Sequence, residues 1–443
     1  MTDITLTELS DGGVASAQGF KAGGIHAGFR HDPNRLDMAL VEADQLCPAA
    51  GVFTQNVFCA APVALSKEHL DGCGYGLARA MLVNSGIANA ATGPEGVAAA
   101  RRMAQIAANQ IGCVPEDILV ASTGVIGVQL DTTPFEYGVA SLQQAFDAPE
   151  HSAQAHPDHA ADGALMEVSG LGAARGIMTT DTVPKQAAVS WTSQDPAFPG
   201  MEFVVGGMSK GSGMIMPDMA TMIAVLTTDA PLVPQFLHQA LKQAVDQSFN
   251  KVTVDSDTST NDTCVAFASG AAAFDPENPE HSAGTFAPGS IAFEEFQAAL
   301  THVCQDLARQ MARDGEGATK LVTVTVSGAA NHEQADLAAR TVANSPLVKT
   351  AIYGNDANWG RIAAALGRSG AQFAQEDVDI DIMGLPVMRS GLPVPFSEEE
   401  ALERFKDPEI AIDVTIGAGL GSATIWTCDF THDYVSINGD YRS

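Results

Sequence analysis

Short apolar runs of strand length alternate with longer amphipathic segments along the chain, which predicts a protein of mixed strands and helices. Strand-like runs lie within 80–93, 118–127, 221–227 and 321–328, and glycine-rich β-like runs lie within 14–30, 38–44 and 49–65. Segments 93–112 and 232–250 have the spacing of amphipathic helices. A further helix is predicted by one apolar stripe, made of Phe296, Leu300, Val303, Leu307 and Met311.

Three stretches depart from this simple alternation. Residues 145–165 mix Pro, Ala, Asp and His without a period, and residues 274–293 are acidic, so we expect both to be exposed insertions. His151, His156 and His159 suggest a metal site, but no cysteine or helical histidine pair fits, and we expect no bound metal. Residues 251–270 predict a strand, a polar turn and a second strand.

Length and composition are those of a folded globular protein with an unusual charge. The 443 residues are 46% apolar, which is enough for one large domain or two to three smaller ones. The formal net charge is −30, which argues against nucleic acid or an anionic membrane as a partner. An acidic, solubilising surface explains this charge without any cationic substrate.

Cysteine usage and the chain start indicate a cellular compartment. The seven cysteines are scattered, with no CxxC pair, which predicts free and mostly buried thiols in a reducing cytosol. The first residues, MTDITLTELSDGG, lack the basic and apolar regions of a secretion signal. No apolar stretch approaches the length of a membrane span, so we expect a soluble, cytoplasmic protein.

Residues 203–229 are the stretch around which we organise the functional interpretation. A glycine-rich turn with Lys210 is followed by the connector Pro217-Asp218 and by an apolar run that opens on Thr221. The residues alone favour a turn before a core strand. A phosphate-binding loop is excluded because Lys210 is followed by Gly211, not Ser or Thr. A threonine at the rim of a core strand can also hold an exposed nucleophile.

Several other polar turns follow predicted strands or helices. The residues alone favour structural turns at Thr123 and Gly124, at Thr180, and at Glu316. Asp257, Asn261 and Asp262 suggest a calcium loop, but the glycine and glutamate spacing of an EF-hand is absent, so we interpret them as a structural turn close to the site. Asn355, Asp356 and Asn358 are interpreted as scaffold residues.

Residues 209–230, SKGSGMIMPDMATMIAVLTTDA, resemble the self-cleavage segment of the ornithine acetyltransferase family, also called the bifunctional glutamate N-acetyltransferases of arginine biosynthesis. Three further stretches resemble family motifs: MTTDTVPK at 178–185, DGEGATK at 314–320 and the turn and helix at 352–367. The resemblance extends over essentially the whole chain. The sequence departs from the commonest pattern at Met216 and Asp218, which flank the cleavage position, and at Ile87.

The resemblance implies roles for individual residues. The chain would cut itself between Ala220 and Thr221, and the new N-terminal Thr221 would be the acyl-carrying nucleophile. Thr123 and Gly124 match the family's oxyanion hole. Residues that match family substrate contacts are Thr180, Lys210, Thr221, Glu316, Asn438 and Ser443.

The implied activity is acetyl transfer from N2-acetyl-L-ornithine to L-glutamate through acetyl-Thr221. The implied architecture is an αββα sandwich similar to N-terminal-nucleophile enzymes, with an α chain of residues 1–220 and a β chain of residues 221–443, assembled as an α2β2 heterotetramer. No metal or nucleotide cofactor is needed. Acetyl-CoA would serve as a second acetyl donor only if the enzyme also makes acetylglutamate directly, an activity that varies within the family.

Two alternatives from other classes stay open at this stage. An amidohydrolase or aminopeptidase of the same general layout would pass the acyl group to water. A non-enzymatic assembly protein would remain a single uncut chain.

Overall fold

The computed structural model describes residues 4–148, 158–159, 164–216, 222–274 and 284–440. The chain forms two compact units. The first comprises Met1–Gly211, Asp218–Asn250 and Thr258–Leu307, and the second comprises Ser212–Pro217, Lys251–Asp257 and Ala308–Ser443. Each unit draws on both sides of position 220/221, so the predicted α and β chains do not correspond to the compact units. The cleavage itself concerns one peptide bond and stays a prediction.

The first unit contains one large, branched sheet. Its path is β1 (Thr7–Glu8), β8 (Lys185–Thr192), β9 (Glu202–Lys210), β10 (Ile223–Thr228), β11 (Thr263–Ala268), β3 (Met38–Phe53), β2 (Phe20–Ile25), β7 (Leu165–Glu167) and β6 (Asp158–His159). β4 (Tyr75–Ile87) pairs with β3 and with β5 (Ile118–Val125). Along one side of β3, its first half pairs with β2 and its second half with β11, so the sheet divides into two layers there.

The buried side chains show that the first unit has four layers, because neighbouring residues of one strand belong to different cores. Met81 of β4 belongs to the same buried cluster as Val225 of β10 and Phe267 of β11, which places this core between the two sheet layers. The next residue, Leu82, belongs to a second cluster on the opposite face of β4. That cluster contains residues of the helices α2 (Gly93–Ile111) and α3 (Thr133–Phe146), and α1 (Ala61–His69) contributes Leu65.

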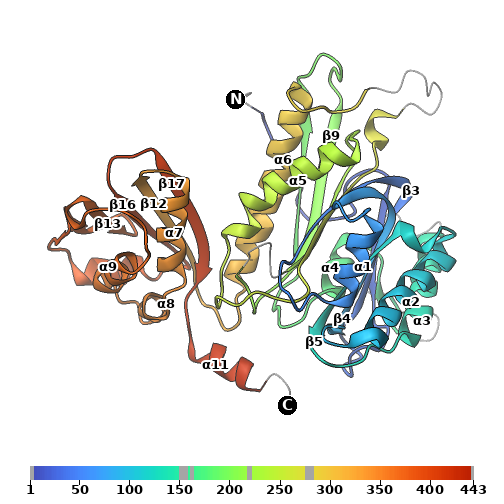
Figure 1. Cartoon of the computed structure of the whole chain (residues 1–443), viewed down its shortest axis with the longest axis horizontal. Helices are drawn as coiled ribbons and strands as arrows, with labels where there is room; N and C mark the ends of the chain where they lie inside the picture. Colours follow the sequence, from blue (N-terminus) through green and yellow to red (C-terminus); the bar gives the residue numbers. More distant parts are fainter. Residues whose placement is uncertain (1–3, 149–157, 160–163, 217–221, 275–283, 441–443) are drawn as a thin grey trace. The chain divides into compact units, whose positions relative to one another are not determined.

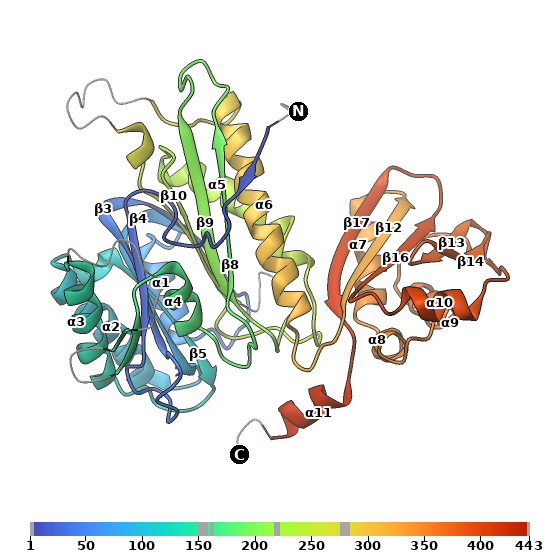
Figure 2. The same cartoon turned by 180° about the vertical axis from the view of Figure 1, so that it is seen from behind.

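Two further helices cover the outer face of the other sheet layer. These are α5 (Pro234–Asp246) and α6 (Ile291–Arg313), which lie on one side of β8–β10 in both views (Figure 1, Figure 2). A methyl group placed on Gly207 of β9 would lie 3.1 Å from Leu307 and 3.3 Å from Val303, both of α6. The first unit therefore has the predicted αββα order. The short α4 (Gly170–Gly176) contributes Ala173 and Ala174 to the core between the sheets.

The sequence explains why the predicted helices form where they do. In α2 the buried residues Ala100, Met103, Ala104 and Ala107 recur at helical spacing. The helix ends where Gly112 takes a left-handed conformation with φ of 84° and its amide bonds the Ala108 carbonyl. The apolar stripe predicted for the region of α6 is buried along its whole length.

The second unit contains a six-stranded sheet of its own, which the sequence analysis did not predict. Its order is β15 (Leu392–Pro393), β14 (Leu385–Arg389), β13 (Val378–Ile382), β16 (Glu409–Ile416), β12 (Leu321–Ala329) and β17 (Gly421–Cys428). Val322, Val324 and Val326 of β12 alternate into one core with residues of α7 (His332–Ala343) and α9 (Trp359–Gly367). The remaining helices are α8 (Pro346–Tyr353), α10 (Glu398–Arg404) and α11 (His432–Gly439).

Two predictions about local structure were wrong. Residues 251–254 form no strand, and only Val252 makes an isolated bridge, to Trp426. The stretch 274–293 is not exposed throughout, because Phe286 is completely buried and its ring centroid lies 4.8 Å from that of Phe198. The apolar surface of Phe286 favours burial although the surrounding stretch is acidic. The stretch also ends inside α6.

No helix in the described part of the chain is long and apolar enough to cross a membrane. All seven cysteines lie in the described ranges, and all are free thiols, as predicted. Four of them, Cys47, Cys264, Cys304 and Cys428, are buried.

The layer of helices on β2–β5 depends on aromatic packing that can be tested. Phe135 of α3 is completely buried, and its ring centroid lies 4.6 Å from that of Phe29. Phe135→Ala should lower the free energy of unfolding by about 3–5 kcal/mol, because it removes the ring and leaves a cavity. Phe58→Ala is the control, since Phe58 is 70% exposed, and it should change the value by less than about 0.5 kcal/mol. Urea unfolding measures both; equal effects would contradict this packing.

Candidate active site

The end of β5 holds the two residues predicted to form an oxyanion hole. β5 runs parallel to β4, with Gly124 opposite Gly86 and Thr123 opposite Ser85. Gly124 has φ of 132°, and a methyl group there would lie 2.2 Å from the Gly86 carbonyl carbon. Only glycine fits this position, because the two backbones meet without room for a side chain. Thr123 and Gly124 are thus adjacent at a fixed strand end, while their oxyanion role stays a prediction.

The side chain of Asn261 joins this strand end to the other sheet layer. Its amide nitrogen donates to the Ser122 carbonyl at 2.8 Å and to the Ala88 carbonyl at 2.6 Å. Its oxygen accepts a hydrogen bond from the Thr260 hydroxyl at 2.6 Å. Asn261 directly precedes β11, so these bonds hold the start of β11 against the ends of β4 and β5.

The start of β10 lies next to the same place. Ile223 pairs with Lys210 of β9 on one side and with Thr263 of β11 on the other. The Thr263 amide also donates to the Met222 carbonyl at 2.9 Å, which fixes the backbone one residue before the strand. Ala220 and Thr221, the predicted cleavage residues, lie outside the described residues, as does Asp218. Met222 is the first described residue after the predicted bond.

A buried ion cluster lies at the ends of β8 and β9. The Asp181 carboxylate accepts hydrogen bonds from the Lys185 ammonium at 2.7 Å and from the Gly211 and Thr179 amides at 2.7 and 2.8 Å. The Asp181 and Lys185 side chains are fully buried. Burial alone would raise the pKa of Asp181, but the positive charges of Lys185 and Lys210 and the hydrogen bonds hold this pKa far below its usual range.

Asp181 is a residue whose importance the sequence analysis missed. It lies in the MTTDTVPK motif, in which the sequence analysis singled out only Thr180. The Asp-x-x-x-Lys spacing within this motif was the available signal. The structure places Lys185 at the start of β8, opposite Ser209, which is the residue before Lys210. The carboxylate fixes the Gly211 amide, so it helps to set the position of the neighbouring Lys210.

The loop that carries Thr180 follows α4 and lies beside the end of β4. The Ser85 hydroxyl donates to the Gly176 carbonyl at 3.1 Å. The Arg35 guanidinium donates to the Thr179 carbonyl at 2.8 Å, which anchors the backbone next to Thr180. Thr180 itself is half-buried. Its substrate role stays a prediction. The segment before it is bonded to Ser85, which lies opposite Thr123 on the neighbouring strand.

Two further predicted residues meet in the second unit. The Asn438 side-chain amide donates to the Glu316 carboxylate at 2.8 Å, across more than a hundred residues of sequence. The Glu316 amide donates to the Ser212 carbonyl at 2.8 Å, and a methyl group on Gly213 would lie 2.3 Å from the carboxyl carbon of Glu316. Gly213 therefore makes room for this carboxylate. Ser443 lies outside the described residues.

Asp255, which the sequence analysis did not single out, fixes the segment that contains Gly213. Its carboxylate accepts hydrogen bonds from the Met214 and Ile215 amides at 2.6 and 2.8 Å. Burial raises the pKa of Asp255, against the effect of these two amides. The Val254 amide donates to the Ile215 carbonyl at 2.7 Å. The two residues that bond this segment, Val254 and Asp255, are therefore neighbours in the sequence.

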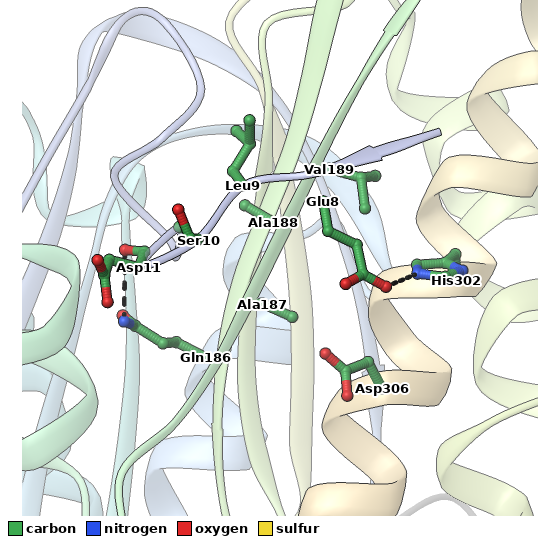
Figure 3. A pocket seen from close by; sticks show the side chains of 11 residues that line it. Glu8, Leu9, Ser10, Asp11, Gln186, Ala187, Ala188, Val189, His302 and Asp306 are labelled. Carbon is green, nitrogen blue, oxygen red and sulfur yellow. Dashed lines mark hydrogen bonds and ion pairs between the residues drawn. The ribbon is translucent and has the colours of Figure 1, made fainter. Parts of the chain in front are cut away.

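The described residues contain no group of three or more His, Cys, Asp or Glu side chains placed to hold a metal ion. His151 and His156 lie outside the described residues, and only the backbone of His159 is described. A cavity of about 390 Å³ in the first unit, lined by β1, β8 and α6, contains none of the predicted site residues (Figure 3). Its exposed His302 and Glu8 side chains lie 3.4 Å apart.

The first unit is thus a four-layer α/β sandwich in which Lys210 pairs with the start of β10, and Asn261 ties the neighbouring β11 to the strand end that carries Thr123 and Gly124. A sequence profile of the ArgJ family matches residues 21–443, and the chain belongs to this family. An arginine biosynthesis bifunctional protein ArgJ from Chlorobaculum tepidum is 45% identical over 443 residues, which is the whole of both chains. The protein of the same name from Dehalococcoides mccartyi is 43% identical over 98% of both chains.

Two solved structures are also similar in sequence. The ArgJ protein from Bacillus halodurans is 46% identical over 48% of this chain and 97% of its own, with a TM-score of 0.45. An ornithine acetyltransferase from Mycobacterium tuberculosis, solved in complex with ornithine, is 34% identical over 48% of this chain and 99% of its own, with a TM-score of 0.38.

The buried Asp181–Lys185 pair leads to a prediction about acid stability. The depressed pKa of Asp181 means that its stabilising effect is complete above the unfolded value of 3.8 and is lost as the pH falls further. Asp181→Asn should lower the free energy of unfolding at pH 7 by about 3–5 kcal/mol, because it removes the carboxylate charge that faces the buried Lys185 ammonium. The difference from the wild type should shrink below pH 3.8.

Denaturant unfolding between pH 2 and pH 7 measures this difference. Asp44→Asn is the matched control, since its pair with Lys21 is exposed and 3.8 Å long, and it should change the value by less than about 1 kcal/mol. A gap between wild type and Asp181→Asn that does not depend on pH would contradict the ionised state of Asp181.

Proposed function

We propose that this protein is a glutamate N-acetyltransferase that moves an acetyl group from N2-acetyl-L-ornithine to L-glutamate through an ester on Thr221. One observation carries this proposal: the chain matches bifunctional ArgJ proteins at 43–45% identity over nearly the full length of both partners. The strand ends described above support it, because they hold polar groups around the residue that follows Thr221.

The proposed nucleophile requires that the chain first cuts itself. The Thr221 hydroxyl attacks the Ala220 carbonyl carbon, the peptide bond to nitrogen breaks, and an ester forms with a free amine on Thr221. Water then opens the ester and releases the Ala220 carboxylate. An N-terminal α-amine ordinarily has a pKa of about 8 and lies within reach of the hydroxyl of its own residue, so it can act as the base that a threonine needs.

Each residue then has a role in two acyl-transfer steps. The Thr221 hydroxyl takes the acetyl group from acetyl-ornithine and releases ornithine, and glutamate's amine takes the acetyl group from the ester. Thr123 and Gly124 stabilise the negative oxygen of each tetrahedral intermediate. Lys210 pairs with a substrate carboxylate and Glu316 with an ammonium group. The other proposed substrate contacts are Thr180, Asn438 and Ser443.

The remaining parts of this proposal concern assembly and second substrates. The reaction as written needs no metal and no nucleotide, and acetyl-CoA enters only as a second acetyl donor for direct acetylation of glutamate. The α and β chains would assemble as α2β2. Seven free thiols support a reducing, cytoplasmic location. The hydrolase alternative is not favoured, because the near full-length relatives are bifunctional ArgJ proteins.

The decisive test of the nucleophile is an intact-mass measurement. The wild-type protein should give two fragments split between Ala220 and Thr221, and Edman sequencing of the second should begin Thr-Met-Ile-Ala. Thr221→Ala should give one uncut chain without acetyltransferase activity, because it lacks the hydroxyl. A wild-type chain that stays whole yet transfers acetyl groups would overturn the mechanism. Release of acetate without acetylglutamate would support the hydrolase instead.

The oxyanion role of Thr123 can be tested separately with a conservative pair. Thr123→Val keeps the shape of the side chain but removes the hydroxyl donor, so kcat should fall by about a hundredfold or more. Thr123→Ser keeps the hydroxyl and should retain most of the activity. Steady-state kinetics on purified, fully cleaved protein distinguish the two. Equal losses in both variants would show that the hydroxyl is not the donor.

A further inference from the structure

Lys349 is a buried lysine of the second unit to which the proposed reaction gives no role. It is 1% exposed and lies on α8, where the other buried residues are apolar. Its ammonium donates to the Thr427 hydroxyl at 2.6 Å and to the Cys428 carbonyl, and it lies 4.6 Å from the centroid of the Phe430 ring. Burying a charge is costly, and an apolar side chain of similar volume often gives equal stability. The ammonium at this place therefore points to a task other than stability.

Lys349 holds both residues that flank Asp429 in the sequence. Its side chain binds the Cys428 carbonyl, and its backbone carbonyl accepts a hydrogen bond from the Phe430 amide at 3.3 Å. Asp429 is itself 1% exposed. Burial lowers the pKa of Lys349, and the nearby carboxylates of Asp429 and Asp255 raise it. One lysine thus fixes the backbone around this buried carboxylate and offsets its charge.

The Asp429 carboxylate in turn binds the end of the loop that carries Glu316. It accepts hydrogen bonds from the Thr319 and Lys320 amides at 2.8 and 3.0 Å, and from the Thr319 hydroxyl at 2.5 Å. Hydrogen bonds to an ionised carboxylate are about twice as strong as those between neutral groups. The backbone that follows Glu316 is therefore firmly held by this one side chain.

The residues on either side of Glu316 also pack directly against the end of β17 and the segment after it. A methyl group on Gly315 would lie 2.7 Å from the Cys428 sulfur, and one on Gly317 would lie 2.6 Å from the Tyr434 amide nitrogen. Gly317 has φ of 69°, so glycine is favoured there for its backbone conformation as well. A shift of the segment that Lys349 holds would therefore move the backbone of Glu316 with it.

We propose that Lys349 is a positioning residue for Glu316. This inference rests on the proposed function, in which Glu316 pairs with an ammonium group of the substrate. N2-acetyl-L-ornithine has one ammonium group, at the end of its side chain, because its α-amine is acetylated. Lys349 fixes the segment around Asp429, and this segment fixes the loop that holds the Glu316 carboxylate in place for that ammonium group. Loss of the Lys349 charge weakens recognition of the donor and leaves the acyl chemistry at Thr221 unchanged.

The test compares two acetyl donors in the cleaved enzyme. N2-acetyl-L-norleucine has a methyl group where N2-acetyl-L-ornithine has its ammonium group, and both donors form the same ester on Thr221. Lys349→Met should lower the ratio of kcat/KM for the charged donor to kcat/KM for the neutral donor by about tenfold or more, because a displaced carboxylate affects only the charged donor. A mere loss of folded enzyme lowers both values equally. An unchanged ratio would overturn the proposal.

Lys251→Met is the matched control. Lys251 belongs to the same unit, its side chain is 14% exposed, and its ammonium pairs with Asp336 of α7 at 2.6 Å. This variant also removes a partly buried lysine charge, but at a place that does not support the loop of Glu316. The ratio should stay within about twofold of the wild-type value. Equal falls in Lys251→Met and Lys349→Met would contradict a specific role of Lys349.

Glu316→Gln tests whether Lys349 acts through this carboxylate. The variant should lose the preference for the charged donor, and adding Lys349→Met to it should lower the ratio no further. A further fall of similar size in the double variant would overturn the positioning role.

Thr427→Val replaces Lys349→Met if the latter does not fold. It keeps the shape of the side chain and removes one of the acceptors of the Lys349 ammonium. The ratio should fall in the same direction, by about threefold or more, because a hydrogen bond to a charged group is lost. An unchanged ratio in a folded, cleaved Thr427→Val enzyme would overturn the proposal.

This inference and the proposed function fail in different ways. A wild-type enzyme that uses the two donors equally well would remove the ammonium-binding role of Glu316, and with it this inference. A wild-type enzyme that prefers the charged donor, together with a Lys349→Met variant that keeps this preference, would remove only the role of Lys349.

Discussion

The two hydrogen bonds donated by the Asn261 amide are the constraint on which the candidate site depends. They tie the start of β11 to the ends of β4 and β5, although these strands belong to different layers of the sandwich. They add to the strand pairing through β3, which joins β11 to β4 and, through β4, to β5. The close backbone approach at Gly124 then allows β4 and β5 to end together at the same level. One polar side chain and one missing side chain thus contribute directly to the local geometry of the site.

Charge is distributed in opposite ways at the surface and at this site. The chain carries a net charge of −30, yet the buried groups near Lys210 include the ion pair of Lys185 with Asp181. Such a pair limits the cost of removing charges from water, whereas a single buried charge would be strongly destabilising. The acidic surface can thus change without disturbing the interior electrostatics, since solvent and salt screen it.

The sequence predicted those features that depend on local pattern. The short apolar run of β5 and the stripe in α6 identified a strand and a helix, and motif resemblance identified Glu316 and Asn438, which the structure joins by a hydrogen bond. The separate sheet of the second unit was not predictable, because periodicity identifies a strand but not its neighbours. The stretch that contains Phe286 was predicted to be exposed because it is acidic, although the Phe286 ring is apolar and buried. The burial of Asp262, which directly precedes β11, could likewise not be read from the sequence, because it depends on the pairing of β9, β10 and β11.

The antiparallel pairing of β9 with β10 has a consequence for the two pieces of a severed chain. Each piece would contribute strands to one continuous sheet, so the backbone hydrogen bonds between Lys210 and Ile223 and along the pair would hold the pieces together after cleavage. Each compact unit also draws residues from both pieces. If either piece were produced alone, it would expose an unpaired, apolar strand edge and would tend to aggregate.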